Sequence, residues 1–102
     1  MNIKDEKITV KIDADLKELI PGYLNNRQLD IKNIITSLEK GDYETIRIIG
    51  HSMKGSGGGY GFDLITELGR AIEQAAKEKD DDLIKAKVEE LKEYLGKIEI
   101  IY

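Results

Sequence analysis

The segment from Gly50 to Gly61 contains the only histidine of the chain, His51, just ahead of a run rich in glycine. Imidazole is largely neutral near pH 7 and is a competent nucleophile, so an exposed histidine can accept a phosphoryl group without an activating base. Lys54 lies one helical turn further on, where its ammonium group can offset the charge of a phosphoryl group in transit. Gly55 leaves bare backbone beside the ring, which lets a partner surface come close. These residues predict a site for phosphoryl transfer.

The glycine run departs from the spacing of nucleotide-binding loops. A dinucleotide-binding loop needs Gly-x-Gly-x-x-Gly, but the sixth position counted from Gly55 is Tyr60. A P-loop needs its lysine after the second glycine, whereas Lys54 precedes the run. A hydrolase is disfavoured because Ser52 and Ser56 have no evident third group to complete a catalytic triad. From the residues alone, the alternative is that His51 is a surface histidine without a functional role.

Composition limits the classes of protein to which the chain can belong. Its 102 residues suffice for one domain with a modest core, and 40% hydrophobic with 35% charged residues is typical of a soluble helical protein. The net charge of −4 is spread along the chain, so we expect no nucleic-acid partner. Without cysteine, and with one histidine, we expect no disulfide and no bound metal. We also expect no membrane span and no signal peptide, and therefore a cytoplasmic location.

From Asp15 onward, apolar residues recur at spacings of three and four, as in amphipathic helices. The spacing predicts a short helix near 14–19, then long helices over about 21–40, 43–57 and 62–79, and a last one from the Asp80–Asp82 run onward. Gly41 is expected to end the first long helix and Asp42 to cap the second. Because such short connections imply antiparallel neighbours, the sequence predicts an all-α, up-down-up-down four-helix bundle over residues 15–102 behind an N-terminal extension of residues 1–14.

On the helix predicted over 43–57, His51 is expected to face solvent. Ile46, Ile49 and Met53 share one face and predict its core contacts. At about 100° per residue, His51 lies almost opposite that face. On the next helix, Gly69 predicts close approach of a neighbouring backbone.

The two chain ends allow two interpretations. Ile8, Val10 and Ile12 alternate with polar residues, as in a strand, and residues 98–102 can be interpreted in the same way. The segments could pair as a small ribbon. Alternatively, an extended N-terminal arm packs on the bundle and the last helix frays, with Ile98 continuing its apolar stripe, since isolated two-stranded ribbons are marginal.

The pattern His51-x-x-Lys54-Gly55, then Gly61 and a further helix, resembles the signature of histidine-containing phosphotransfer (HPt) domains. These domains are intermediate carriers in two-component phosphorelays. The resemblance extends over roughly residues 15 to 97. It implies that His51 accepts a phosphoryl group from a receiver-domain aspartate and passes it to another receiver, that Lys54 assists, and that Gly55 admits the receiver.

The resemblance further implies a carrier without an ATP site of its own, whose Mg²⁺ is supplied by the receiver domain and whose partners are receivers and, as a further candidate, a hybrid histidine kinase. We expect a monomer. Arg47 is a candidate contact for an acidic partner or an ordinary solvated charge, and Ile48 and Tyr60 are candidate docking residues or peripheral core. Gly58 is a further candidate contact. Gly61 matches a structural turn glycine of the family.

Two other functions compete with the carrier. The first is an adaptor that docks on a receiver or kinase without being phosphorylated, with His51 incidental. The second, ranked below it, is an autonomous kinase or hydrolase. The sequence identifies neither the donor nor the acceptor, nor the direction of net phosphoryl flow, and the glycines at 57 to 59 exceed what the family pattern requires.

Overall fold

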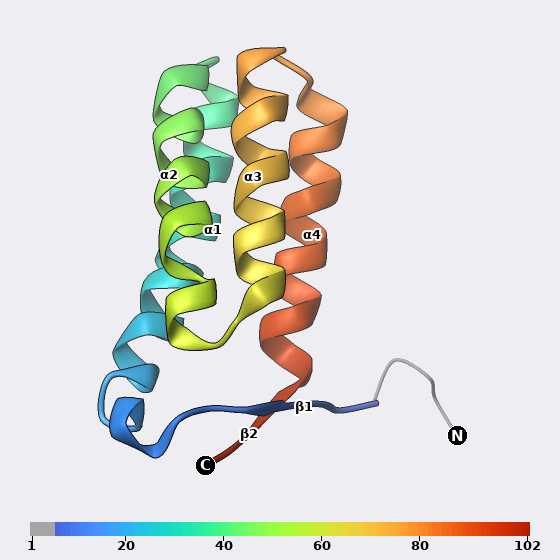
Figure 1. Cartoon of the computed structure of the whole chain (residues 1–102). Coiled ribbons are helices and arrows are strands. Elements are labelled where there is room, and N and C mark those ends of the chain that lie inside the picture. Colours follow the sequence, from blue (N-terminus) through green and yellow to red (C-terminus); the bar gives the residue numbers. More distant parts are fainter. Residues whose placement is uncertain (1–5) are drawn as a thin grey trace.

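Four long helices pack lengthwise in the computed structural model, which describes residues 6–102 (Figure 1). The helices are α1 (Ile20–Glu39), α2 (Tyr43–Ser56), α3 (Asp63–Lys77) and α4 (Asp81–Lys97). Short connections join each helix to the next, and α2 and α3 lie side by side along their length (Figure 1). The prediction of an all-α helical bundle is confirmed.

The local signals for the helix ends act as the sequence predicts. Gly41 ends α1 with a φ of +68°, a conformation that glycine adopts at little cost. The Asp42 carboxylate accepts a hydrogen bond from the Thr45 amide at 3.1 Å and so caps α2. Asp80 caps α4 in the same way through the Leu83 amide. The short helix expected near 14–19 is a single 3₁₀ turn, η2 (Ala14–Leu16), which precedes α1.

One apolar core runs through the bundle and draws on every long helix. Its fully buried large side chains are Ile12, Ile20, Ile34, Ile46, Met53, Phe62, Ile65, Ile72, Ile84 and Leu91. Not every apolar residue that recurs at these spacings after Asp15 is buried: Leu19, just before α1, and Ile35, on α1, are 54% and 46% exposed. On α4, Tyr94 is buried in the core while Leu95 only packs at its edge.

Glycines allow the backbones of α2 and α3 to touch. A β-carbon added at Gly69 would lie 2.5 Å from the Lys54 amide nitrogen, and one added at Gly50 would lie 2.6 Å from the Glu73 amide nitrogen. Further along, a β-carbon at Gly57 would lie 2.6 Å from the Thr66 amide nitrogen. The close approach predicted from Gly69 is therefore confirmed, and the backbones of α2 and α3 are in direct contact at these glycines.

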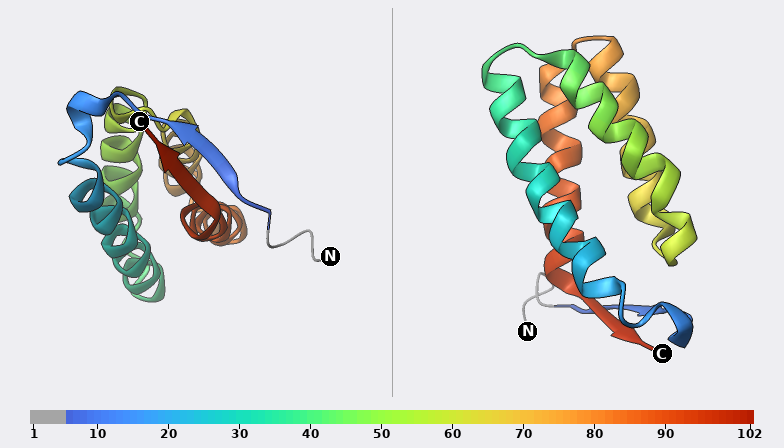
Figure 2. Two further views of the ribbon diagram at one scale, coloured as in Figure 1. Left: turned by 90° about the horizontal axis from the view of Figure 1, so that it is seen from below. Right: turned by 90° about the vertical axis from the view of Figure 1, so that its left-hand side faces the viewer.

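The chain ends do form a ribbon, which the sequence left as one of two possibilities. Strand β1 (Ile8–Lys11) pairs in parallel with β2 (Ile98–Ile101), so that Ile8 lies opposite Ile98. Figure 2 shows the two strands beneath the lower ends of the helices. Because α4 ends at Lys97, Ile98 begins a strand and does not extend the helical stripe.

The segment after β1 is anchored in the core. Ile12 is 2% exposed, and its side chain fills the space beside Gly61, where an added β-carbon would lie 2.6 Å from the Ile12 Cδ1 atom. Gly61 has a φ of +96°, which supports the structural role expected of it. Of the predicted extension, residues 1–5 lie outside the described part of the chain.

Within residues 6–102, no helix is both long and apolar enough to cross a membrane.

Candidate functional site

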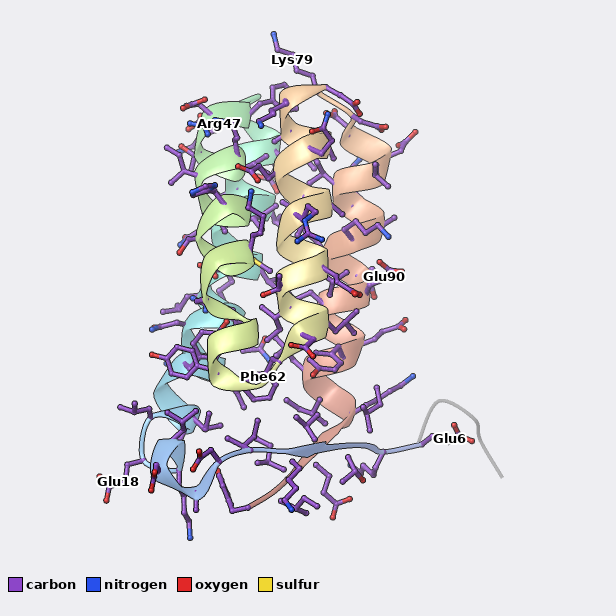
Figure 3. The ribbon with its side chains drawn as sticks, in the orientation of Figure 1. Glu6, Glu18, Arg47, Phe62, Lys79 and Glu90 are labelled. Carbon is purple, nitrogen blue, oxygen red and sulfur yellow. The ribbon has the colours of Figure 1, made fainter. Side chains whose placement is uncertain are left out.

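His51 lies at the surface of α2, with 65% of its side chain exposed. It follows Arg47 by one turn, and Figure 3 shows Arg47 near the upper end of α2. The Nδ1 atom of His51 lies 2.8 Å from the Oε2 atom of Glu73 on α3. An ionised carboxylate can only accept, so this contact holds the ring proton on Nδ1. Within residues 6–102 this is the ring's only hydrogen bond, so no described residue binds the lone pair that this tautomer leaves on Nε2.

The same carboxylate also binds Lys54. The Lys54 ammonium donates to the Oε1 atom of Glu73 at 2.7 Å, while the side chain of Glu73 is only 8% exposed. These contacts lower the pKa of Glu73 to about 2; the hydrogen bond from Lys54 is the largest cause, burial opposes it, and the hydrogen bond from His51 adds to it. Glu73 is therefore ionised at neutral pH and holds two side chains of α2 at once.

The position of Glu73 depends on the glycines between α2 and α3. A β-carbon at Gly50 would collide with the Glu73 backbone, and a β-carbon at Gly69 would lie 2.7 Å from the Gly50 carbonyl oxygen. Because both positions are glycine, the α3 backbone comes close enough for the short Glu73 side chain to span both His51 and Lys54. A larger residue at either glycine would separate these groups.

The surface beside His51 is open. Nothing lies within 4 Å of the β-carbon that would be added at Gly55, one turn after His51. Ile48 is 54% exposed on the same helix. By helical geometry, Ile48, His51 and Gly55 point in similar directions, so the His51 ring adjoins an apolar side chain and a patch of uncovered backbone.

The other residues predicted as partner contacts have contacts within the chain. Arg47 forms an ion pair with Glu44, which precedes it by three residues on α2. Tyr60 stacks on Tyr23 with ring centroids 4.2 Å apart and is half-buried. Gly58 is exposed and its amide donates to the Thr66 hydroxyl at 2.8 Å. The roles of these three residues toward a partner stay predictions.

Glu73 is the residue of this candidate site that the sequence did not reveal. It follows Gly69 by four residues, so the two share a face of α3. The rest of that buried face carries small or apolar residues, namely Ile65, Leu68, Ile72, Ala75 and Ala76. A charged side chain on such a face needs a partner, and this signal indicates that Glu73 binds another element without indicating which one.

Among residues 6–102, no three histidine, cysteine, aspartate or glutamate side chains gather as a set that could hold a metal ion.

Comparison with known protein families identifies a match for most of the chain. A family model described as the Hpt domain matches residues 18–99, which include both helices of the site. No curated protein and no solved structure matches the chain significantly.

Proposed function

The chain belongs to the Hpt domain family, whose members act in histidine phosphotransfer in two-component phosphorelays, and on that premise we propose that His51 carries the phosphoryl group. The observation behind this proposal is the contact between His51 Nδ1 and the Glu73 carboxylate at 2.8 Å. It fixes the tautomer in which Nε2, on a ring that is 65% exposed, is the nucleophile.

The proposed step is a reversible in-line transfer from the acyl phosphate of a receiver-domain aspartate. The lone pair of His51 Nε2 attacks phosphorus, an N–P bond forms, the P–O bond to the aspartate breaks, and the carboxylate leaves with the electron pair. The ring keeps its proton on Nδ1 and becomes cationic. The ionised Glu73 carboxylate lies 2.8 Å from Nδ1, the atom that bears this proton, and stabilises the developing positive charge.

Lys54 would act on the phosphoryl oxygens. Its ammonium lies 2.7 Å from the carboxylate that also holds His51, and its side chain is 33% exposed, so it can turn toward a group bound on the ring. Its positive charge offsets part of the negative charge of the phosphoryl group in transit. The Mg²⁺ ion that phosphoryl transfer employs would come from the acidic site of the receiver.

The partners in this proposal are receiver domains, with a hybrid histidine kinase as a further candidate donor. Gly55 and Ile48 would form the centre of the docking surface, because one offers uncovered backbone and the other an exposed apolar side chain beside His51. The chain would work as a monomeric cytoplasmic carrier, without an ATP site or turnover of its own. We also propose that the four helices run antiparallel in up-down-up-down order, with α2 and α3 as neighbours. The short connections between successive helices support this order.

The direct test is transfer from a receiver labelled with ³²P on its aspartate, screened over a panel of receivers. We expect an acid-labile, base-stable label on the wild-type chain and none on His51→Gln, with unchanged helical circular dichroism. Ser52→Ala, which alters the exposed neighbour of the histidine, is the matched control and should label normally. A label that persists in His51→Gln would refute the assignment, and receiver binding without any label would favour the adaptor.

A further inference from the structure

The end of α2 contains a side-chain hydroxyl where a continuous helix would have a backbone hydrogen bond. In an α-helix, the amide of Gly58 would donate directly to the carbonyl oxygen of Lys54, four residues earlier. Here the Gly58 amide donates to Thr66 Oγ1 at 2.8 Å, and that hydroxyl donates to the Lys54 carbonyl oxygen at 3.0 Å. The Thr66 hydroxyl is thus inserted between the Gly58 amide and the Lys54 carbonyl, and it acts both as an acceptor and as a donor.

This insertion occurs where α2 ends. The preceding bond, from the Gly57 amide to the Met53 carbonyl oxygen, is still helical at 3.0 Å. After it the chain continues in a 3₁₀ turn, η3 (Gly58–Tyr60). Gly57 is needed for the geometry, because a β-carbon there would lie 2.8 Å from Thr66 Oγ1. Two of the glycines that the family pattern does not explain therefore adjoin one hydroxyl group.

Helix α3 contacts Lys54 at three points. The Thr66 hydroxyl donates to the Lys54 carbonyl oxygen, and the Glu73 carboxylate binds the Lys54 ammonium group at 2.7 Å. The backbone of Gly69 packs against the Lys54 amide nitrogen. The three residues of α3 follow one another at spacings of three and four, so they lie on one face. A lysine side chain has many rotamers. Contacts that fix the amide nitrogen and the carbonyl oxygen of Lys54 reduce the range of positions that its ammonium group can reach.

We propose that Thr66 is a positioning residue for Lys54, and that its hydroxyl bridge keeps the Lys54 ammonium in place for phosphoryl transfer. The inference rests on the proposed function of His51 and adds a residue that acts on the reaction only through another side chain. Replacing Thr66 by valine keeps the shape but leaves the Lys54 carbonyl and the Gly58 amide to find other partners. The end of α2 would then lengthen or fray, and either change displaces Lys54.

The kinetic test uses Thr66→Val, Thr66→Ser and, as a matched control, Thr36→Val at an exposed threonine of α1. At saturating phosphorylated receiver, we expect Thr66→Val to slow transfer roughly fivefold, the equivalent of one lost hydrogen bond. The dissociation constant for the receiver should stay within about twofold of the wild-type value, since the Thr66 hydroxyl is bonded within the chain to Gly58 and Lys54. Thr66→Ser should restore the rate and Thr36→Val should leave it unchanged. Wild-type transfer by Thr66→Val would overturn the inference.

A double-mutant cycle with Lys54→Ala separates positioning from general destabilisation. If Thr66 acts through Lys54, then Thr66→Val slows the wild-type chain but causes no further slowing in the Lys54→Ala background. Equal slowing in both backgrounds would show that Thr66 acts on the fold and would overturn the proposal. Circular dichroism at the assay temperature verifies that all the variants are folded.

Amide hydrogen exchange tests the bridge without any phosphoryl transfer. The Gly58 amide should exchange faster in Thr66→Val than in the wild type and should recover its protection in Thr66→Ser. Unchanged exchange would overturn the bridge itself. If no receiver labels wild-type His51, the proposed function fails and the positioning role falls with it. Normal wild-type labelling with an unaffected Thr66→Val overturns this inference alone.

Discussion

Gly69 of α3 lies so close to Gly50 of α2 that a β-carbon added at Gly69 would be 2.7 Å from the Gly50 carbonyl oxygen. The nearest atoms around Gly69 belong mostly to the backbone of α2, which cannot move aside as a flexible side chain can. The contact between the two helices therefore sets the distance across which Glu73 reaches His51.

Gly69→Ala should lower the free energy of unfolding by about 1–3 kcal/mol, because the added methyl group overpacks the contact between α2 and α3. Urea unfolding followed by circular dichroism measures this change. Gly96→Ala on α4 is the control, since nothing lies within 4 Å of its added β-carbon. There we expect no loss, and a gain of up to about 1 kcal/mol from helix propensity. Equal effects at the two positions would contradict the packing argument.

Gly55→Phe should leave the fold intact and slow transfer from a receiver at least about tenfold, because the ring would occupy the surface that the receiver must approach. The space around Gly55 is open, so the substitution creates no clash within the chain. Binding and transfer assays measure the effect, and Gly96→Phe on α4 serves as the control. Loss of helical circular dichroism in Gly55→Phe would show instead that Gly55 is structural.

Lys54→Ala should slow phosphoryl transfer roughly tenfold while receiver binding stays measurable, because a charge that acts in the transition state is lost. Single-turnover transfer at saturating receiver gives the rate, and a titration gives the dissociation constant. Lys92→Ala, at an exposed lysine of α4, controls for the change in net charge. Unchanged transfer kinetics in Lys54→Ala would exclude the electrostatic role.

Acid should weaken the fold partly through Glu73. Its pKa falls from the ordinary 4.5 to about 2 in the folded chain, chiefly because of the hydrogen bond from Lys54. The unfolded chain therefore binds this proton more readily, so the stabilisation is present above about pH 4.5 and is lost as the pH falls toward 2. Urea unfolding between about pH 6 and pH 2 should show a steeper loss for the wild type than for Glu73→Gln. Parallel curves would contradict the assignment of this pKa.

The sequence predicted the parts of the fold that depend on local signals. Gly41 and Asp42 locate the turn between α1 and α2, and the apolar spacing on α2 places His51 on the face away from the core. Glu73 could not be assigned to the site in this way, because its contact depends on how α3 is rotated against α2. That rotation follows from backbone contacts at Gly50 and Gly69, which involve residues far apart in the chain.

The terminal strands illustrate the same limit. The alternation of Ile8, Val10 and Ile12 is compatible with a strand or with an extended arm, and nothing local selects the partner. Pairing with β2 requires the finished bundle to bring the end of α4 beside the segment that enters α1. The parallel register of Ile8 with Ile98 is therefore a product of tertiary structure.

That register also affects the order of folding. Pairing Ile8 with Ile98 closes a loop that spans almost the whole chain, so its entropic cost is among the largest of any contact in the molecule. The helices, joined by short turns, can associate through contacts between neighbours in the sequence. We therefore expect the ribbon to assemble after the helical pairs, late on the folding pathway, as is typical of contacts between distant residues. Substitutions in β1 would then accelerate unfolding while leaving the rate of folding nearly unchanged.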